Sequence, residues 1–411
     1  MSLPLLAAFR SRLAALKYHV TAPKASQLTP DWPMGPPIVG GFLTTPSGIG
    51  ESARLCLAAF RRLGLFPGEI DLSPRFLPHD RMAPSANAAF GGTGPLVLHV
   101  NPPELPAVCA HLGPNILGGR PIIGYWAWEL PDIPDDWHRG FAYVHEIWVP
   151  SRFTAAAVGR HTDKPVRVVP HPVPSVAAAP HRARFGFPEA ACVVMAACDL
   201  RSSMARKNPL GALAAFRAAF DDDPSRLLVL KVGGLTGNEA AFETIRRAVD
   251  GLGNVLLLTE VLSPEEMDSL IASIDILLSL HRSEGFGLLL AQAMRAGKAV
   301  VATDWSGSTD FVTADTAEPV PAHLVTVEDP QRRYGGRNQI WADPDLDESA
   351  RLLRRLADDP ERRIEIGTRA RRKIAHWCDD LNYSASLGEP FRRATQRPIS
   401  AVTNLPSSAT R

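Results

Sequence analysis

Residues 279–311 read SLHRSEGFGLLLAQAMRAGKAVVATDWSGSTDF, and the rest of the chain can be interpreted outward from them. The apolar run Ile274–Leu280 leads into this stretch; it is short and β-branched at its start, which predicts a buried strand. A polar loop with two glycines follows. A helical pattern then runs from about Leu288 to Arg295 and stops at Gly297, the usual place of a C-terminal cap. Because Ala299–Thr303 predicts a second strand, the whole stretch predicts a βαβ unit.

The loop after the first of these strands carries groups that can bind a sugar and an anion. Its backbone N–H groups lie at a helix N-terminus, where they are free to bind an anion. Gly285 and Gly287 let the backbone approach a ligand closely, and the Glu284 carboxylate suits sugar hydroxyls. Gln292 follows eight residues later, about two helical turns on, and Ser306-Gly307-Ser308 adds a second polar turn. An ordinary βαβ crossover with a surface glutamate is the alternative interpretation.

Composition indicates a soluble globular protein with a large core. The chain has 411 residues, a length for which two domains are the default expectation. Hydrophobic residues make up 45% and charged residues 21%, and the formal net charge is +1. No strong overall charge draws such a chain to nucleic acid, and no apolar run approaches the roughly 20 residues that span a bilayer.

The N-terminal residues and the cysteines bear on localisation. The first twenty residues are amphipathic, with Arg10, Arg12 and Lys17 interspersed. They predict a surface helix, with contact to a membrane surface as the alternative. The five cysteines are scattered and form no C-x-x-C pair, which favours a reducing, cytoplasmic compartment and argues against a disulfide framework or a zinc site.

The first half of the chain repeats the pattern of strand, loop and helix. Pro37–Leu43 predicts a strand, and Glu51–Leu63 predicts an amphipathic helix after a loop that contains Gly48 and Gly50. This loop can cradle a phosphate by the same helix-terminus physics, or it is simply a tight turn. The spacing of a dinucleotide-binding fingerprint is missing here.

Two further strand ends of the first half carry polar or aromatic residues. The strand Pro95–Val100 leads to Asn101, and we interpret His99 within it as a core residue. The strand Pro121–Gly124 leads to Trp128 and Glu129. Aromatic rings beside a carboxylate suit the stacking and hydrogen bonding of a sugar, and aromatic core anchors are the alternative.

The second half begins with a cationic segment. Ala191–Ala197 predicts a strand, and the segment CDLRSSMARKN that follows contains Arg201, Arg206 and Lys207. Pro209 then opens a helix, so Arg206 and Lys207 come just before a helix N-terminus. Two cations and a helix dipole make a strong site for a pyrophosphate, whereas a solvated basic loop is the alternative.

The order of the elements predicts the architecture. Short strands alternate with helices, which indicates open parallel sheets with helices on both faces. Ligands bind such sheets at the carboxyl ends of the strands, where every loop singled out above is expected. Further along, residues 317–337 are expected to be irregular, and residues 341–345, reading WADPD, are expected to start a helix that ends at Ala357.

The loop at the centre of the sequence resembles a known motif. Residues 284–287 (EGFG), Ala293-Met294, Gly297 and residues 300–302 (VVA) resemble the donor-sugar motif of retaining glycosyltransferases of family 4, which have the GT-B fold. Residues 123–137 (IGYWAWELPDIPDDW), 145–151 (HEIWVPS) and 168–173 (VVPHPV) resemble a bacterial branch of that family involved in surface polysaccharides. The resemblance therefore covers most of the chain.

This resemblance implies roles for the residues at matching positions. Glu284 would contact the transferred sugar, and Lys207, with Arg206 or Arg201, would bind the donor diphosphate and stabilise the leaving group. The remaining positions form two groups. For the donor they are Leu262, before a helix that starts at Ser263, with Gly285, Phe286, Gly287 and Gln292. For the acceptor and the cleft they are Gly48, Gly50, Asn101, Trp128 and Glu129.

Two positions depart from the pattern of the family. Gln292 stands where a second glutamate usually contacts the nucleotide ribose; an amide can still form that hydrogen bond, but it carries no charge. Asn101 stands where the family often has a histidine that lines the active cleft. Both departures motivate a rival hypothesis, a non-catalytic carbohydrate-binding relative, and a second rival is a phosphorylase-type enzyme on the same fold.

The resemblance also implies an organisation for the whole chain, namely two Rossmann-like, doubly wound α/β domains that face an interdomain cleft. Residues 1–172 form the acceptor domain, with a helix and linker at 1–35. Residues 173–385 form the nucleotide-sugar domain, and residues 386–411 return toward the first domain.

The expected reaction is transfer of a hexosyl group, with mannose from GDP-mannose suggested by the branch, to a glycan or glycolipid acceptor in polysaccharide synthesis. The nucleoside-diphosphate sugar is a substrate, and neither a cofactor nor a metal is expected. The expected place is the cytoplasm, with the inner face of the membrane as the site of any peripheral contact, and no nucleic acid is expected as a partner.

Overall fold

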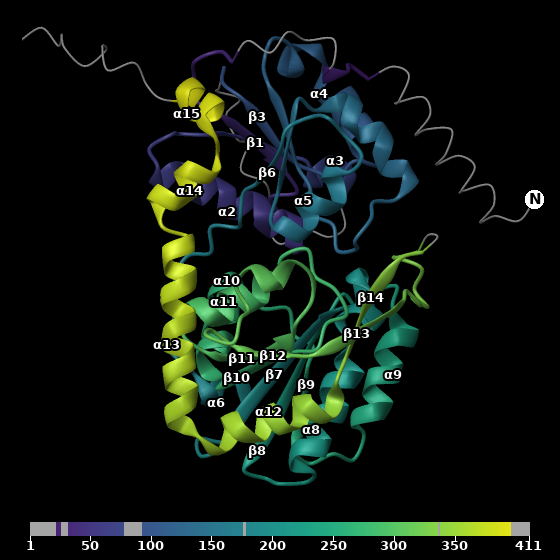
Figure 1. The fold of residues 1–411 in the computed structure, drawn as a ribbon, viewed down its shortest axis with the longest axis vertical. Coiled ribbons are helices and arrows are strands. Elements are labelled where there is room, and N and C mark those ends of the chain that lie inside the picture. Colours follow the sequence, from purple (N-terminus) through teal and green to yellow (C-terminus); the bar gives the residue numbers. More distant parts are fainter. Residues whose placement is uncertain (1–21, 26–31, 78–92, 176–177, 336–337, 396–411) are drawn as a thin grey trace, which may run out of the picture. The chain divides into compact units, whose positions relative to one another are not determined.

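The computed structural model describes residues 22–25, 32–77, 93–175, 178–335 and 338–395 (Figure 1). The helix predicted over the first twenty residues and the tail from Gln396 lie outside this part of the chain. Two compact units divide the protein. The first comprises Met1–Tyr125, Asp136–Ile147 and Ser384–Arg411, and the second comprises Trp126–Asp135 and Trp148–Tyr383.

The first sheet has six strands in the order β2-β1-β3-β4-β5-β6. Its pairs β1–β2, β1–β3 and β3–β4 are parallel. The strands are β1 (Ile38–Gly41), β2 (Gly68–Asp71), β3 (Leu96–His99), β4 (Ile122–Tyr125), β5 (Glu146–Val149) and β6 (Val166–Val168). The strands β1, β3, β4 and β5 are buried along their whole length, as expected of parallel strands that are covered on both faces.

Side-chain capping and packing explain the helices that accompany this sheet. Ser47 caps α2 by accepting a hydrogen bond from the Gly50 backbone N–H. Phe60 of α2 packs on Phe391 of α15 with ring centroids 5.3 Å apart, so the end of the described chain belongs to the core of the first unit. The elements are α2 (Gly48–Arg62), α3 (Ser73–Phe76), α4 (Leu105–Leu117), a 3-10 segment (Asp135–Tyr143), α5 (Arg152–Gly159), α14 (Asp380–Ser386) and α15 (Glu389–Thr395).

The second sheet also has six strands, in the order β12-β11-β10-β7-β8-β9, and all its pairs are parallel. They are β7 (Cys192–Asp199), β8 (Arg226–Gly233), β9 (Val255–Leu258), β10 (Ile276–Ser279), β11 (Ala299–Thr303) and β12 (Glu318–Val320). Its helices are α6 (Arg182–Phe185), α7 (Met204–Lys207), α8 (Pro209–Phe220), α9 (Glu239–Val249), α10 (Pro264–Ser273), α11 (Leu288–Arg295), α12 (Leu346–Asp358) and α13 (Pro360–Trp377). Two parallel sheets with helices confirm the predicted α/β class.

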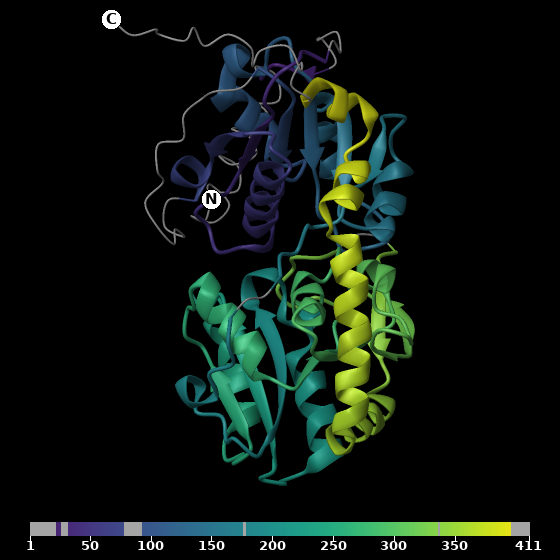
Figure 2. The ribbon, with the colours of Figure 1, turned by 90° about the vertical axis from the view of Figure 1, so that its left-hand side faces the viewer.

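Side-chain alternation along β7 builds a core on each face of the second sheet. Val194 joins a cluster with residues of α8 and α12, whereas its neighbour Val193 joins a cluster with residues of α11 and α13. Figure 2 shows α13 running as one long helix along this unit. The buried Ile366 and Ile374 of α13 belong to these cores, one to each cluster.

The central βαβ unit is confirmed as predicted. The helix α11 spans Leu288–Arg295 and the strand β11 spans Ala299–Thr303. Gly297 has a φ of 78°, the left-handed conformation that ends many helices, and its N–H donates to the Met294 carbonyl over 2.9 Å. The loop that contains Glu284 therefore connects the strand β10 to the helix α11.

Two predictions for the later part of the chain are wrong. Residues 317–337 are not irregular throughout, because β12 lies within them and β13 (Ala322–Thr326) pairs antiparallel with β14 (Ile340–Pro344). The WADPD segment mostly belongs to β14 rather than starting a helix. The helix α12 begins only at Leu346, where the Asp345 side chain caps it by accepting from the Glu348 N–H.

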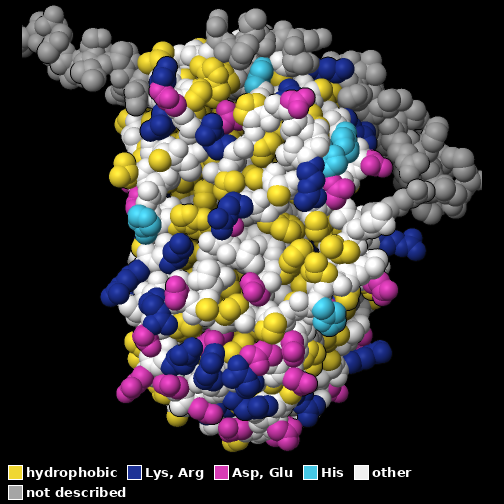
Figure 3. All heavy atoms as spheres, viewed as in Figure 1, with side chains coloured by type: hydrophobic (Ala, Val, Ile, Leu, Met, Phe, Trp, Pro, Cys, Tyr) yellow, Lys and Arg dark blue, Asp and Glu magenta, His cyan; other side chains and the backbone are white. Residues whose placement is uncertain are grey.

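The surface and the cysteines complete the picture. Figure 3 shows basic and acidic side chains intermixed on the face that carries α12, in keeping with the net charge of +1. All five cysteines are buried, and none of them is part of a disulfide bond. Burial raises the pKa of the Cys192 thiol to about 11 and those of Cys109 and Cys198 to about 12. No helix in the described ranges is long and apolar enough to cross a membrane.

Candidate active site

The turn between α7 and α8 is fastened to the end of β10. Asn208 lies in this turn with a φ of 52° and caps α8 by accepting from the Gly211 N–H over 3.2 Å. Its side-chain amide also donates to the Leu280 carbonyl over 2.9 Å. Lys207 precedes Asn208, and the Glu284 loop follows Leu280. Asn208 therefore brings the predicted cationic segment and the Glu284 loop together.

Glu284 lies between the two cations of α7. Lys207 Nζ donates to its Oε1, and Arg206 Nη1 lies 3.3 Å from its Oε2. Burial alone would raise the pKa of Glu284, but the charges of Lys207 and Arg206 outweigh it and lower the pKa to about 2. The carboxylate is therefore ionised at neutral pH.

The backbone of Glu284 is fixed as firmly as its side chain. Its N–H donates to Ser306 Oγ over 2.8 Å, and its carbonyl accepts from the Gly307 N–H over 2.8 Å. The polar turn predicted at residues 306–308 is thus the support of the Glu284 loop. His281 lies beside it, fully buried, with Nε2 3.1 Å from Ser308 Oγ. Burial lowers the pKa of His281 to about 4, so this ring is neutral at pH 7.

The aromatic segment 126–129 lies against the same loop within the second unit. Ser283 Oγ donates to the Glu129 carbonyl, and Thr154 Oγ1 donates to the Trp128 carbonyl over 3.0 Å. A Cβ on Gly285 would lie 2.8 Å from the Trp128 carbonyl oxygen, which explains why glycine is needed there. Trp128 and Glu129 are thereby brought next to the Glu284 loop.

Tyr334 is a site residue that sequence reasoning missed. Its ring lies 5.3 Å from the Arg206 guanidinium and 5.7 Å from the Trp128 ring. Burial raises the pKa of Tyr334, and the Glu129 carboxylate raises it further, so its hydroxyl stays protonated. Nothing local in the sequence marks this residue, because its partners are far away in the chain and its loop was expected to be irregular.

Other predicted donor residues occupy varied places in the second unit. Arg201 is paired with Asp199 over 2.7 Å, and Gln292 is half-buried on α11. Gly287 has a φ of 91° and is the N-cap residue of α11. The two apolar residues have mainly packing contacts: Phe286 is buried in the core against Phe311, and Leu262 packs on the same cluster.

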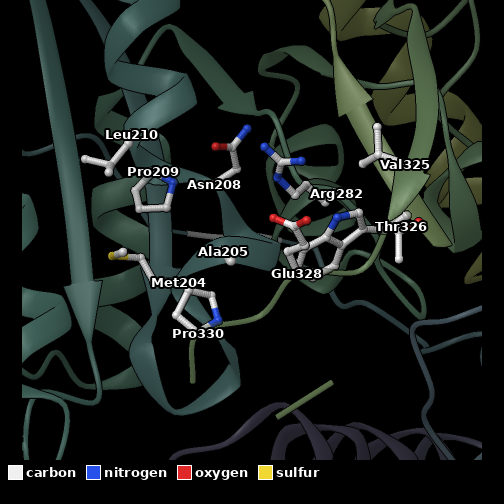
Figure 4. Close-up of a pocket in the computed structure, with 11 residues that line it drawn as sticks. Met204, Ala205, Asn208, Pro209, Leu210, Arg282, Val325, Thr326, Glu328 and Pro330 are labelled. Atoms are coloured by element: carbon white, nitrogen blue, oxygen red, sulfur yellow. The ribbon is translucent and has the colours of Figure 1, made fainter. Parts of the chain in front are cut away.

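Two cavities flank this arrangement. A small one, about 40 Å³, is lined by Lys207, Glu284, Gly287 and the start of α11, so it coincides with the predicted donor site. The other, about 610 Å³, lies between the α7–α8 turn and the hairpin of β13 and β14 (Figure 4). Its lining includes Arg282 and Glu328 but none of the residues that line the small cavity.

The predicted acceptor residues of the first half, apart from Trp128 and Glu129, lie in the first unit. Gly48 is exposed at the start of α2. Gly50 is buried, and a Cβ there would lie 2.6 Å from the Phe42 carbonyl oxygen. The Asn101 carbonyl accepts from the Glu104 N–H over 3.2 Å. His99 is fully buried, stacked on Tyr125 with centroids 4.4 Å apart, which confirms its interpretation as a core residue.

Gly307→Ala is expected to destabilise the second unit and the Glu284 loop. A Cβ at this position would overlap the Gly285 carbonyl and lie 2.8 Å from Ser151 Oγ, so the backbone must shift. Overpacking of this kind costs about 1–3 kcal/mol. Urea unfolding followed by circular dichroism measures the change. Gly253→Ala is the control, because a Cβ there meets nothing within 4 Å. Equal midpoints for the two variants would contradict the expectation.

Comparison with known proteins places these residues in a wider context. Residues 193–334 match the sequence family described as glycosyl transferases group 1. A D-inositol 3-phosphate glycosyltransferase of Corynebacterium efficiens is 31% identical over 164 residues, which are 39% of this chain and 34% of that protein. The match thus spans about a third of the length of this curated relative.

Solved structures cover more of the chain at lower identity. The Anabaena protein HepE, solved with UDP and glucose, is 15% identical with a TM-score of 0.60 over 85% of this chain and 98% of its own. A glycosyltransferase from Rickettsia africae is 11% identical with a TM-score of 0.61 over 88% of this chain and 99% of its own. With the two parallel sheets, these likenesses confirm the predicted two-domain GT-B fold. The match over residues 193–334 then supports a glycosyltransferase.

Proposed function

We propose that the protein is a retaining glycosyltransferase that moves a hexosyl group from a nucleoside-diphosphate sugar to a hydroxyl group of a glycan or glycolipid. The observation that carries this proposal is the meeting of Lys207, Arg206 and Glu284 beside the start of α11. The matched family supports it from the sequence side. Retention of configuration, mannose as the sugar and a role in polysaccharide synthesis rest on the motif resemblance.

The residues fit the chemical task of such a reaction. Glycosyl transfer from a nucleotide sugar builds negative charge on the departing diphosphate and positive character on the sugar, and preorganised charges stabilise both. The Lys207 ammonium lines the small cavity, where it can meet the diphosphate. The ionised Glu284 carboxylate can hold sugar hydroxyls and face the cationic ring. A glycolipid acceptor would put the reaction at a membrane surface, for which we propose the amphipathic first twenty residues as the contact.

Nucleoside diphosphates are expected to stabilise the protein. UDP, GDP, ADP and dTDP, each with and without a sugar, are tested by thermal shift. A ligand that binds only the folded state adds about 2.7 kcal/mol of stability at a hundredfold excess over its dissociation constant. One base that raises the melting temperature, followed by transfer with the anomeric configuration read by NMR, would support the proposal. A protein that no nucleotide stabilises would overturn it.

Transfer activity is expected to persist after metal removal with EDTA. Lys207 already supplies a positive charge in the lining of the cavity, the role that a divalent cation has in other phosphoryl-group sites. The rate is measured by release of the nucleoside diphosphate before and after chelation, with Mg²⁺ added back as the control. A rate that falls on chelation and returns with Mg²⁺ would contradict metal independence.

A further inference from the structure

Arg206 and Lys207 are neighbours in sequence but have different surroundings. The Arg206 side chain is 2% exposed, whereas the Lys207 side chain is 24% exposed and lines the small cavity. Arg206 Nη1 donates to the Ser283 carbonyl over 2.7 Å, and Nε donates to the Ser202 carbonyl over 3.2 Å. The guanidinium therefore holds the backbone just before Glu284 while its charge lies beside the Glu284 carboxylate.

Tyr334 covers Arg206 and completes its burial. The ring lies 5.3 Å from the guanidinium carbon, within the range of a cation–π interaction. Burial opposes the charge of Arg206, but Tyr334, Glu284 and Glu129 together raise its pKa above the ordinary value. A fixed cation is thus held between the Tyr334 ring and the Glu284 carboxylate.

The loop that carries Tyr334 is fastened to the segment that carries Arg206. The Asp329 carboxylate accepts from the Tyr334 N–H over 3.0 Å and from Ser203 Oγ over 2.8 Å. The Gln331 side chain donates to the Leu200 carbonyl over 2.7 Å and accepts from the Met204 N–H. Residues 329–334 therefore form a strap that is hydrogen-bonded to Leu200, Ser203 and Met204. Tyr334, at the end of this strap, lies over Arg206.

We propose that Arg206 is a positioning residue that orients Glu284, that Tyr334 locks it in place, and that Lys207 is the cation that binds the donor diphosphate. This inference rests on the proposed function and assigns separate tasks to two adjacent cations. It also gives the loop between β13 and β14 a part in the reaction. A misplaced Glu284 lowers the rate of the chemical step, because a displacement of about 1 Å can cost 10²-fold. A misplaced Glu284 leaves the contact between Lys207 and the diphosphate intact.

The test separates turnover from affinity. Calorimetry gives the Kd of the nucleoside diphosphate that stabilises the wild type, and a transfer assay gives kcat and KM. For Arg206→Lys and Tyr334→Ala we expect kcat to fall about 10- to 100-fold, with Kd within about threefold of wild type. Lys207→Ala is expected to raise Kd more than tenfold. Tyr334→Phe keeps the ring over Arg206 and loses the hydroxyl, so it is expected to recover most of the kcat lost in Tyr334→Ala.

A matched control and clear contrary results complete the design. Arg333→Ala changes an exposed neighbour of Tyr334 in the same strap and is expected to behave as wild type. If Arg206→Lys or Tyr334→Ala raises Kd as much as Lys207→Ala does, Arg206 is a diphosphate ligand and the inference is overturned. An unchanged kcat in Tyr334→Ala also overturns it, and this variant decides the matter if Arg206→Lys does not fold. A wild type without diphosphate binding or transfer overturns the proposed function itself, before any variant is compared.

Discussion

Lys207→Ala is expected to lower kcat/KM for glycosyl transfer by about 10²- to 10³-fold, the typical loss when one preorganised group that stabilises developing charge is removed. The ammonium lines the small cavity and is the more exposed of the two cations beside Glu284. Without it, the negative charge that builds on the departing diphosphate has no cation to meet it there. Initial rates at several donor concentrations measure the effect.

The control for this variant is Lys373→Ala, which makes the same change on the exposed face of α13. Both variants are expected to keep the melting temperature of the wild type within a few degrees, because Glu284 keeps Arg206 as a partner when Lys207 is lost. Activity in Lys207→Ala that matches the control would remove Lys207 from the site.

Glu284→Gln is expected to have opposite effects on turnover and on diphosphate binding. The carboxylate that would hold the sugar is lost, so we expect transfer to fall by at least about 10²-fold. In the described structure, however, Lys207 donates to Glu284 itself. A diphosphate must compete with that carboxylate for the ammonium. Because glutamine leaves Lys207 without its charged partner, we expect the free nucleoside diphosphate to bind several-fold more tightly.

Calorimetric titration with the nucleoside diphosphate alone measures this second effect, and a transfer assay measures the first. Glu361→Gln, an exposed change at the start of α13, is the matched control. Binding that weakens in Glu284→Gln would show that Glu284 does not compete for Lys207. Transfer at the wild-type rate would take Glu284 out of the reaction.

The parts of the fold that depend on local pattern could be predicted from the sequence. The helix α11 and the strand β11 have the predicted bounds, because buried apolar runs and a glycine cap define both. The hairpin of β13 and β14 was missed. Several residues of β13 are exposed, so burial leaves no periodic pattern along it, and the Asp and Pro of WADPD also resemble a helix start.

The candidate site, like the fold, could be predicted only in part from the sequence. The proximity of Lys207 and Glu284 follows from the rule that parallel strands present their loops at one edge. The burial of Arg206 could not be foreseen, because Tyr334 and Ser283, which enclose it, come from loops whose position depends on tertiary contacts. Sequence reasoning therefore assigned Lys207, with Arg206 or Arg201, to the donor diphosphate, although the surroundings of Arg206 and Lys207 differ sharply.

The five buried cysteines can report local unfolding of the protein, because their thiols react only when they become exposed. A thiol must be both exposed and ionised to react with an alkylating reagent, and burial opposes both conditions. Cys56 and Cys109 belong to the first unit, and Cys192, Cys198 and Cys378 belong to the second. Pulsed alkylation followed by peptide mass spectrometry can therefore follow the loosening of each unit separately in the unmodified chain, without introduced probes or tags.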